Sequence, residues 1–152
     1  MINEEPTFTF ITFLLAVIGY AGMTFVVLRS INKPVPFLFW RINAVIILAH
    51  VVLIWTHRYE MQFELSIRNG YSGFIIFHSA LLIILISTIV NQRISRLLIR
   101  VSFIIVAAGA IGATFRYEVV LIYKIPVLIL TAFGLFGLIK IYFHNWKQKF
   151  TS

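Results

Sequence analysis

The 152-residue sequence contains no cysteine and no aspartate, and only five of its residues are acidic. Without cysteine there are no disulfides, no thiolate metal ligands and no redox thiols. Without aspartate there is no Ser-His-Asp triad, and because no long apolar run contains a carboxylate, a carboxylate-driven transporter is disfavoured as well. No glycine-rich phosphate loop follows a strand pattern, so nothing indicates a kinase.

Charge of either sign is also scarce, and apolar residues take its place. Hydrophobic residues make up 61% of the chain and charged residues 12%, and the mean hydropathy is +0.97. A soluble domain of this length has too little interior to bury so much apolar surface. Residues 6–28 and 69–92 contain no charged side chain, and runs of that length can cross the hydrocarbon as helices. We therefore expect an all-α, polytopic integral membrane bundle that forms a single transmembrane domain over residues 1–152.

The apolar runs predict five transmembrane helices, near residues 8–28, 37–57, 71–91, 97–115 and 125–145. All four prolines fall at the edges of these runs, where a missing backbone N–H is least harmful. The segment 58–70 lies between the second and third spans and is expected to form a short amphipathic surface helix.

The distribution of charge predicts the orientation. With five spans, one side of the membrane receives nine basic residues: Arg29, Lys33, Arg41, Arg93, Arg96, Arg100, Lys140, Lys147 and Lys149. The other side receives four, namely Arg58, Arg68, Arg116 and Lys124, together with all five glutamates. The positive-inside rule then places the N-terminus outside and the C-terminus in the cytoplasm. We expect a bacterial-type inner membrane as the location and the lipid bilayer as the main partner, and no nucleic acid, since the basic residues form no continuous soluble patch.

The eight glycines form four pairs with i, i+3 spacing: Gly19/Gly22, Gly70/Gly73, Gly109/Gly112 and Gly134/Gly137. Small residues allow close approach of helix backbones in lipid. Three of the pairs lie inside the first, fourth and fifth spans. We therefore expect those spans to form a scaffold and the second and third spans, which contain histidines, to form the functional site.

Two of these histidines lie in the stretch "AHVVLIWTH". His50 and His57 are seven residues apart, and Asn43 precedes His50 by another seven, so the three lie on one stripe of a helix. Such a polar stripe should face protein or a cavity, not lipid. His78 lies in the third span. His50 and His78 are each eight residues from the outer end of their span, about 12 Å deep at the helical rise.

Three interpretations of the histidines stay open. In the first, each imidazole is neutral and hydrogen-bonded and only fixes helix packing. In the second, His50 and His78 are the axial ligands of a b-type haem, whose propionates meet a group of outer residues: His57, Arg58, Arg68 and Arg116. In the third, His50, His57 and His78 bind copper, zinc or iron, and Glu60 or Glu64 adds a carboxylate.

Three stretches resemble the last two spans of the YozB-like group of small multi-pass membrane proteins: "GFIIFHSALLIILI" (73–86), "NQRISRLLIR" (91–100) and "AAGAIGATFRY" (107–117). The resemblance implies a role in cytochrome oxidase assembly and makes His78 a candidate haem or metal ligand. The phrase "WTHRYE" (55–60) is similar to His-Arg pairs of haem A synthases and other membrane haem proteins.

From these observations we expect a redox or haem-handling protein of a respiratory membrane, active in electron transfer or in oxidase assembly. A quinone or other membrane subunits are the expected partners, and Glu60 and Glu64 would shape their access. The alternative is a non-catalytic accessory subunit of a membrane complex, in which the histidines only lock helix contacts.

Overall fold

The computed structural model describes the backbone of residues 6–31, 33–68, 70–116 and 123–150, and the side chains of 7–31, 33–68, 70–115 and 123–143. Within these ranges the fold is all-helical, as expected, and contains no strand. The elements are α1 (Pro6–Arg29), α2 (Phe37–Leu53), the π-helix η1 (Ile54–Arg58), α3 (Phe63–Ser66), α4 (Tyr71–Ser87), α5 (Gln92–Arg116) and α6 (Lys124–Phe150).

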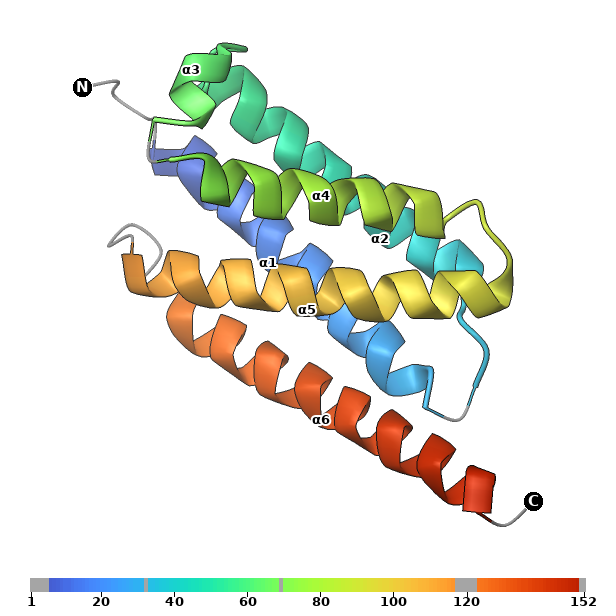
Figure 1. The fold of residues 1–152 in the computed structure, drawn as a ribbon. Coiled ribbons are helices and arrows are strands. Elements are labelled where there is room, and N and C mark those ends of the chain that lie inside the picture. Colours follow the sequence, from blue (N-terminus) through green and yellow to red (C-terminus); the bar gives the residue numbers. More distant parts are fainter. Residues whose placement is uncertain (1–5, 32, 69, 117–122, 151–152) are drawn as a thin grey trace.

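The long helices alternate in direction along the bundle, and α1 begins at the opposite end from the end of α6 (Figure 1). We call the end that contains residues 29–41 and 87–96 the basic end. The other end, which contains residues 58–70, we call the α3 end.

Four of the five expected spans are long and apolar enough to cross a membrane: Thr7–Arg29, Phe37–Arg58, Gln92–Phe115 and Lys124–Phe143. Helix α4 is apolar but has only 17 residues. It is therefore about 25 Å long, against a hydrocarbon thickness of about 30 Å. The five-span prediction is thus supported for four helices, and the third span is shorter than the predicted range 71–91.

The connection between α4 and α5 explains why α4 ends before the predicted residue 91 and why α5 begins before the predicted residue 97. The hydroxyls of Ser87 and Thr88 donate to the carbonyls of Ile84 and Leu85 at 2.6 and 2.7 Å, and such local bonds compete with helix continuation. Three residues later, the side chain of Asn91 accepts a hydrogen bond from the N–H of Ile94 at 3.1 Å. This is an N-cap, and it lets α5 begin at Gln92 instead of near residue 97.

The surface segment is also less helical than expected. Only four residues, Phe63–Ser66, form a helix between η1 and α4. The preceding turn places Glu60 and Met61 at positive φ, 48° and 58°, a conformation that side chains other than glycine rarely adopt. This turn ends η1 sharply, so the chain crosses the α3 end of the bundle as a short loop.

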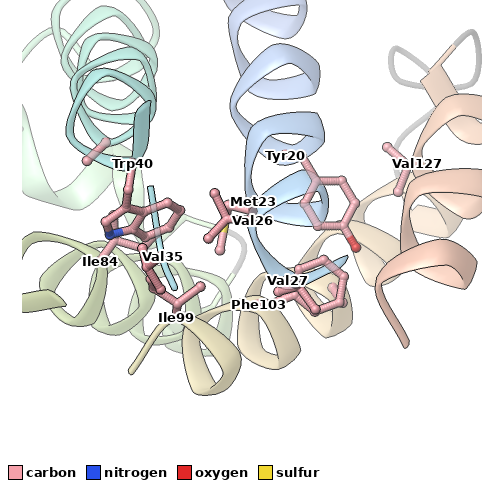
Figure 2. Packing of buried hydrophobic residues seen from close by; sticks show 12 residues of the cluster. Tyr20, Met23, Val26, Val27, Val35, Trp40, Ile84, Ile99, Phe103 and Val127 are labelled. Carbon is pink, nitrogen blue, oxygen red and sulfur yellow. The ribbon is translucent and has the colours of Figure 1, made fainter. Parts of the chain in front are cut away.

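The hydrophobic core is concentrated towards the basic end. Trp40, Val35, Ile84 and Ile99 pack together, and Met23 and Val26 of α1 connect them to a second group around Tyr20 and Phe103 (Figure 2). The indole N–H of Trp40, which is fully buried, donates to Ser87 Oγ at 2.8 Å and so joins α2 to α4. The basic end of the bundle is therefore closed by apolar packing and by buried hydrogen bonds, which include that of Trp40 to Ser87 and that of Ser95 Oγ to the Ser87 carbonyl.

The glycines contribute to more helix contacts than those within the expected scaffold of α1, α5 and α6. Helices α1, α5 and α6 do contact one another, and Gly134 of α6 accommodates the ring of Phe103 of α5. However, Gly19 and Gly22 of α1 face α2, where they make room for Ile47 and Asn43. The small residues of α1 therefore join the scaffold to the site helix α2, because α1 packs both on α2 and on α5 and α6.

Candidate functional site

A cavity of about 340 Å³ lies between α1, α2, α4 and α5, and its lining extends from the α3 end as far as Met23 and Ile84 of the core. It exists because α1 packs mainly on α2 and α6, and α4 packs mainly on α5, so α2 and α4 make few contacts with each other. Its lining includes Gly70, which directly precedes α4, and extends along the helix from Gly73 to Ile84, about 17 Å at the helical rise.

The cavity walls are mostly apolar, and their polar groups fall at two levels. Arg58 and Arg68 line the cavity at the α3 end, and His50, Trp55 and His78 line it further in. A concave apolar site with a few convergent polar groups is the usual form of a small-molecule or cofactor site. The volume also lies within the range of about 300–1,000 Å³ that is typical of such sites.

His50 is fixed by a contact with α1. Its Nδ1 lies 2.8 Å from the backbone carbonyl oxygen of Thr12. A carbonyl can only accept a hydrogen bond, so Nδ1 must carry the proton and donate it. In the neutral ring the lone pair is then on Nε2, and His50 is among the residues that line the cavity.

His78 has the same tautomer for two reasons. Its Nδ1 donates to the carbonyl of Phe74, one turn earlier in α4, at 2.8 Å. Its Nε2 accepts the indole N–H of Trp55 at 2.9 Å, and an atom that accepts this bond has no proton of its own. The ring also stacks on Phe74, with centroids 4.0 Å apart. Both ring nitrogens of His78 are therefore engaged by the protein.

Two of the three residues of the predicted polar stripe, Asn43 and His50, face protein as expected, and their partner is α1. Asn43 Nδ2 donates to the carbonyl of Gly19 at 3.0 Å, and His50 bonds to that of Thr12. His57 places its ring 3.9 Å from that of Phe8, centroid to centroid. The structure thus brings His50 and His78 to one cavity, whereas His57 is exposed and lies outside the cavity lining.

The remaining predicted site residues are divided between the cavity and the surface. Arg58 and Arg68 line the cavity, and the side chain of Arg116 lies outside the described residues. Glu60 and Glu64 are exposed and do not line the cavity. Within the described part of the chain, no three histidine or acidic side chains are grouped closely enough to hold a metal ion. The structure therefore does not assemble the predicted site of three histidines and a glutamate.

Trp55 was not predicted as a site residue, although it makes the most direct contact with one. It lies in η1, where the wider π-helical turn changes the direction of the side chains relative to a continuous α-helix. The apolar sequence around Trp55 contains no proline or glycine that would signal this change. Gly73, which also lines the cavity, has open space where a Cβ would stand.

The fold and the site together define an all-helical bundle with an apolar, histidine-lined cavity, and its four long apolar helices are compatible with a multi-pass membrane protein. Searches of protein-family models, of curated proteins and of solved structures found no match to this chain.

Proposed function

We propose that this chain is a multi-pass protein of a respiratory membrane whose cavity binds a b-type haem, which His50 and His78 would hold through their imidazoles. Its role is then electron transfer or oxidase maturation. The observation that carries the proposal is that both imidazoles line one cavity and each donates its Nδ1–H to a helix carbonyl.

The donor set fits an iron ligand. Metal-binding histidines characteristically donate their second ring N–H to a carbonyl or carboxylate, which fixes the ring and makes the other nitrogen more basic. His50 has this arrangement, with Nε2 as the remaining nitrogen. His78 has it too, except that Trp55 must release Nε2 before that atom can bind iron. A bound haem supplies one-electron redox chemistry.

The other cavity residues have supporting roles. The guanidinium groups of Arg58 and Arg68 line the α3 end, and their positive charge complements the negative charge of propionates. The apolar walls exclude water and lower the local dielectric, which strengthens these charge interactions. Trp55 holds the His78 ring in the tautomer that iron binding needs, because its N–H requires an unprotonated Nε2.

A second candidate function is that of an accessory subunit whose histidines only stabilise helix packing. The specific observation in its favour is that both nitrogens of His78 already have hydrogen-bond partners. Under this alternative the protein binds no cofactor and the Trp55–His78 bond is permanent.

Absorption spectroscopy of the protein purified from haem-sufficient membranes distinguishes the haem protein from the accessory subunit. We expect a Soret band that shifts on reduction and is lost in His50→Gln and His78→Gln, since glutamine keeps a polar side chain but is a poor iron ligand. His57→Gln is the matched control, because His57 lies outside the cavity lining, and it should retain the band. Trp55→Phe should also retain the band, because it removes the group that competes for Nε2.

Two outcomes would contradict the haem proposal. One is a colourless wild-type protein that is folded and remains colourless when haem is added. The other is a Soret band that is retained in both His50→Gln and His78→Gln, which would contradict the assignment of these two residues as ligands. The first outcome favours the accessory-subunit alternative.

A further inference from the structure

Arg100 has a buried atom that lacks a partner. Its Nε is shielded from solvent and forms no hydrogen bond within the described residues. Arg100 is half-buried as a whole, and so is Arg96, one helical turn earlier in α5. Two like charges at i, i+4 repel each other, and a buried donor without an acceptor is unfavourable. An anion bound by both arginines would offset the repulsion and would offer the Arg100 side chain a hydrogen-bond acceptor.

The protein itself does not supply this anion in the described part of the chain. Gly134 and Gly137 of α6 make room for Phe103 of α5 and Leu28 of α1, so the three helices converge near the basic end. The described charged side chains of these three helices towards the basic end are all basic, namely Arg29, Arg93, Arg96, Arg100 and Lys140. The described acidic residues, Glu60 and Glu64, lie at the α3 end. Among the described residues, Arg96 and Arg100 therefore have no acidic partner.

Two other basic residues at this end, Arg41 and Lys140, have contacts within the described residues. Arg41 donates its Nε to the carbonyl of Thr88 at 3.2 Å. The ammonium of Lys140 lies 5.7 Å from the ring centroid of Phe136. Arg100 differs from both in having a buried, unpaired N–H, which singles out the Arg96–Arg100 pair.

We propose that Arg96 and Arg100 bind the headgroup phosphate of an anionic phospholipid in the leaflet at the basic end. Guanidinium groups bind phosphate through parallel, charge-assisted hydrogen bonds. The same helix exposes Leu97 and Ile104, at 60% and 52% of their surface, beside the arginine pair. Acyl chains can lie against these side chains, which favours a lipid over free phosphate as the source. The inference rests on the membrane insertion in the proposed function but not on haem binding.

The test is retention of lipid by the purified full-length chain, measured by native mass spectrometry with phosphatidylglycerol and with phosphatidylcholine. Arg96→Gln and Arg100→Gln should each weaken phosphatidylglycerol binding by about tenfold, the effect of losing one charged hydrogen-bond pair. Arg93→Gln is the matched control, because Arg93 is exposed on the same helix and the charge change is identical. It should have little effect.

Further variants and ligands make the result decisive. Arg100→Lys keeps the charge but lacks the guanidinium fork, so it should bind less tightly than wild type and serves if the glutamine variant fails to fold. Equal weakening in Arg93→Gln and Arg100→Gln would overturn the site in favour of diffuse attraction. Full occupancy by inorganic phosphate with no preference for phosphatidylglycerol would overturn the lipid assignment. A colourless protein that still binds the lipid selectively would contradict the haem proposal alone.

Discussion

At the scale of single residues, the closest contact between α1 and α2 depends on one missing side chain. Gly22 faces Asn43, whose amide donates to the carbonyl of Gly19. A Cβ on Gly22 would collide with the oxygen of that amide. Because Asn43 belongs to the same stripe as His50, the position of Gly22 also sets how the histidine helix lies on α1.

We therefore expect Gly22→Ala to destabilise the protein by about 1–3 kcal/mol through overpacking, less the roughly 1 kcal/mol that alanine adds to helix propensity. Gly112→Ala is the control, since a Cβ at Gly112 meets nothing within 4 Å, and it should be neutral or slightly stabilising. The measurement is unfolding in detergent micelles followed by circular dichroism. Equal stability of the two variants would show that the α1–α2 contact is not this close.

The histidines show which part of the site could be predicted from residue spacing and which part could not. The seven-residue repeat correctly predicted that Asn43 and His50 face protein. It could not predict that their partners are backbone carbonyls of α1, because main-chain acceptors leave no signal in sequence. It also could not predict the Trp55–His78 bond, since that contact depends on the local π-helical turn.

At the scale of helices, the apolar runs predicted the order of the helices, four of the five are long enough to cross a membrane, and the predicted ends were less accurate. Expected and observed limits differ most around α4 and α5, where Ser87, Thr88 and Asn91 bond to nearby backbone groups. Hydropathy does not register such bonds, because they depend on the rotamer of a single polar side chain.

Ser87 also makes one of the polar contacts that close the basic end, and this gives an element-scale prediction. Ser87→Ala leaves the buried indole N–H of Trp40 without an acceptor, so we expect a loss of about 1–3 kcal/mol. Ser79→Ala is the control on the same helix, because the Ser79 hydroxyl bonds only to the carbonyl of Ile76. Chemical denaturation in micelles measures both.

The double variant makes this prediction specific to the Trp40–Ser87 bond. Replacing both partners, as in Trp40→Phe with Ser87→Ala, removes the unpaired donor, so the combined loss should be smaller than the sum of the two single losses. Strict additivity would mean that the two side chains do not stabilise each other.

At the scale of the whole molecule, the apolar core and the cavity share part of their side chains. Trp40 and Ile99 belong to the buried core and do not line the cavity, whereas Met23 and Ile84 of that core also line the cavity that contains both candidate haem ligands. Composition predicted a membrane bundle but not the cavity, because amino-acid content does not determine which helices pair. The cavity arises from the way the helices pair, with α1 on α2 and α4 on α5.

The orientation of the molecule in the membrane is itself testable, because a chain without cysteine gives no background in thiol labelling. Glu64 and Arg93 are exposed and lie at the two ends of α4. If α4 crosses the membrane and the basic end is cytoplasmic, an impermeant maleimide should label Glu64→Cys in intact cells and should label Arg93→Cys only after lysis. The cavity would then open towards the outer side. Labelling of both variants in intact cells would show that the short helix α4 does not span, and the reversed pattern would place the histidine cavity on the cytoplasmic side.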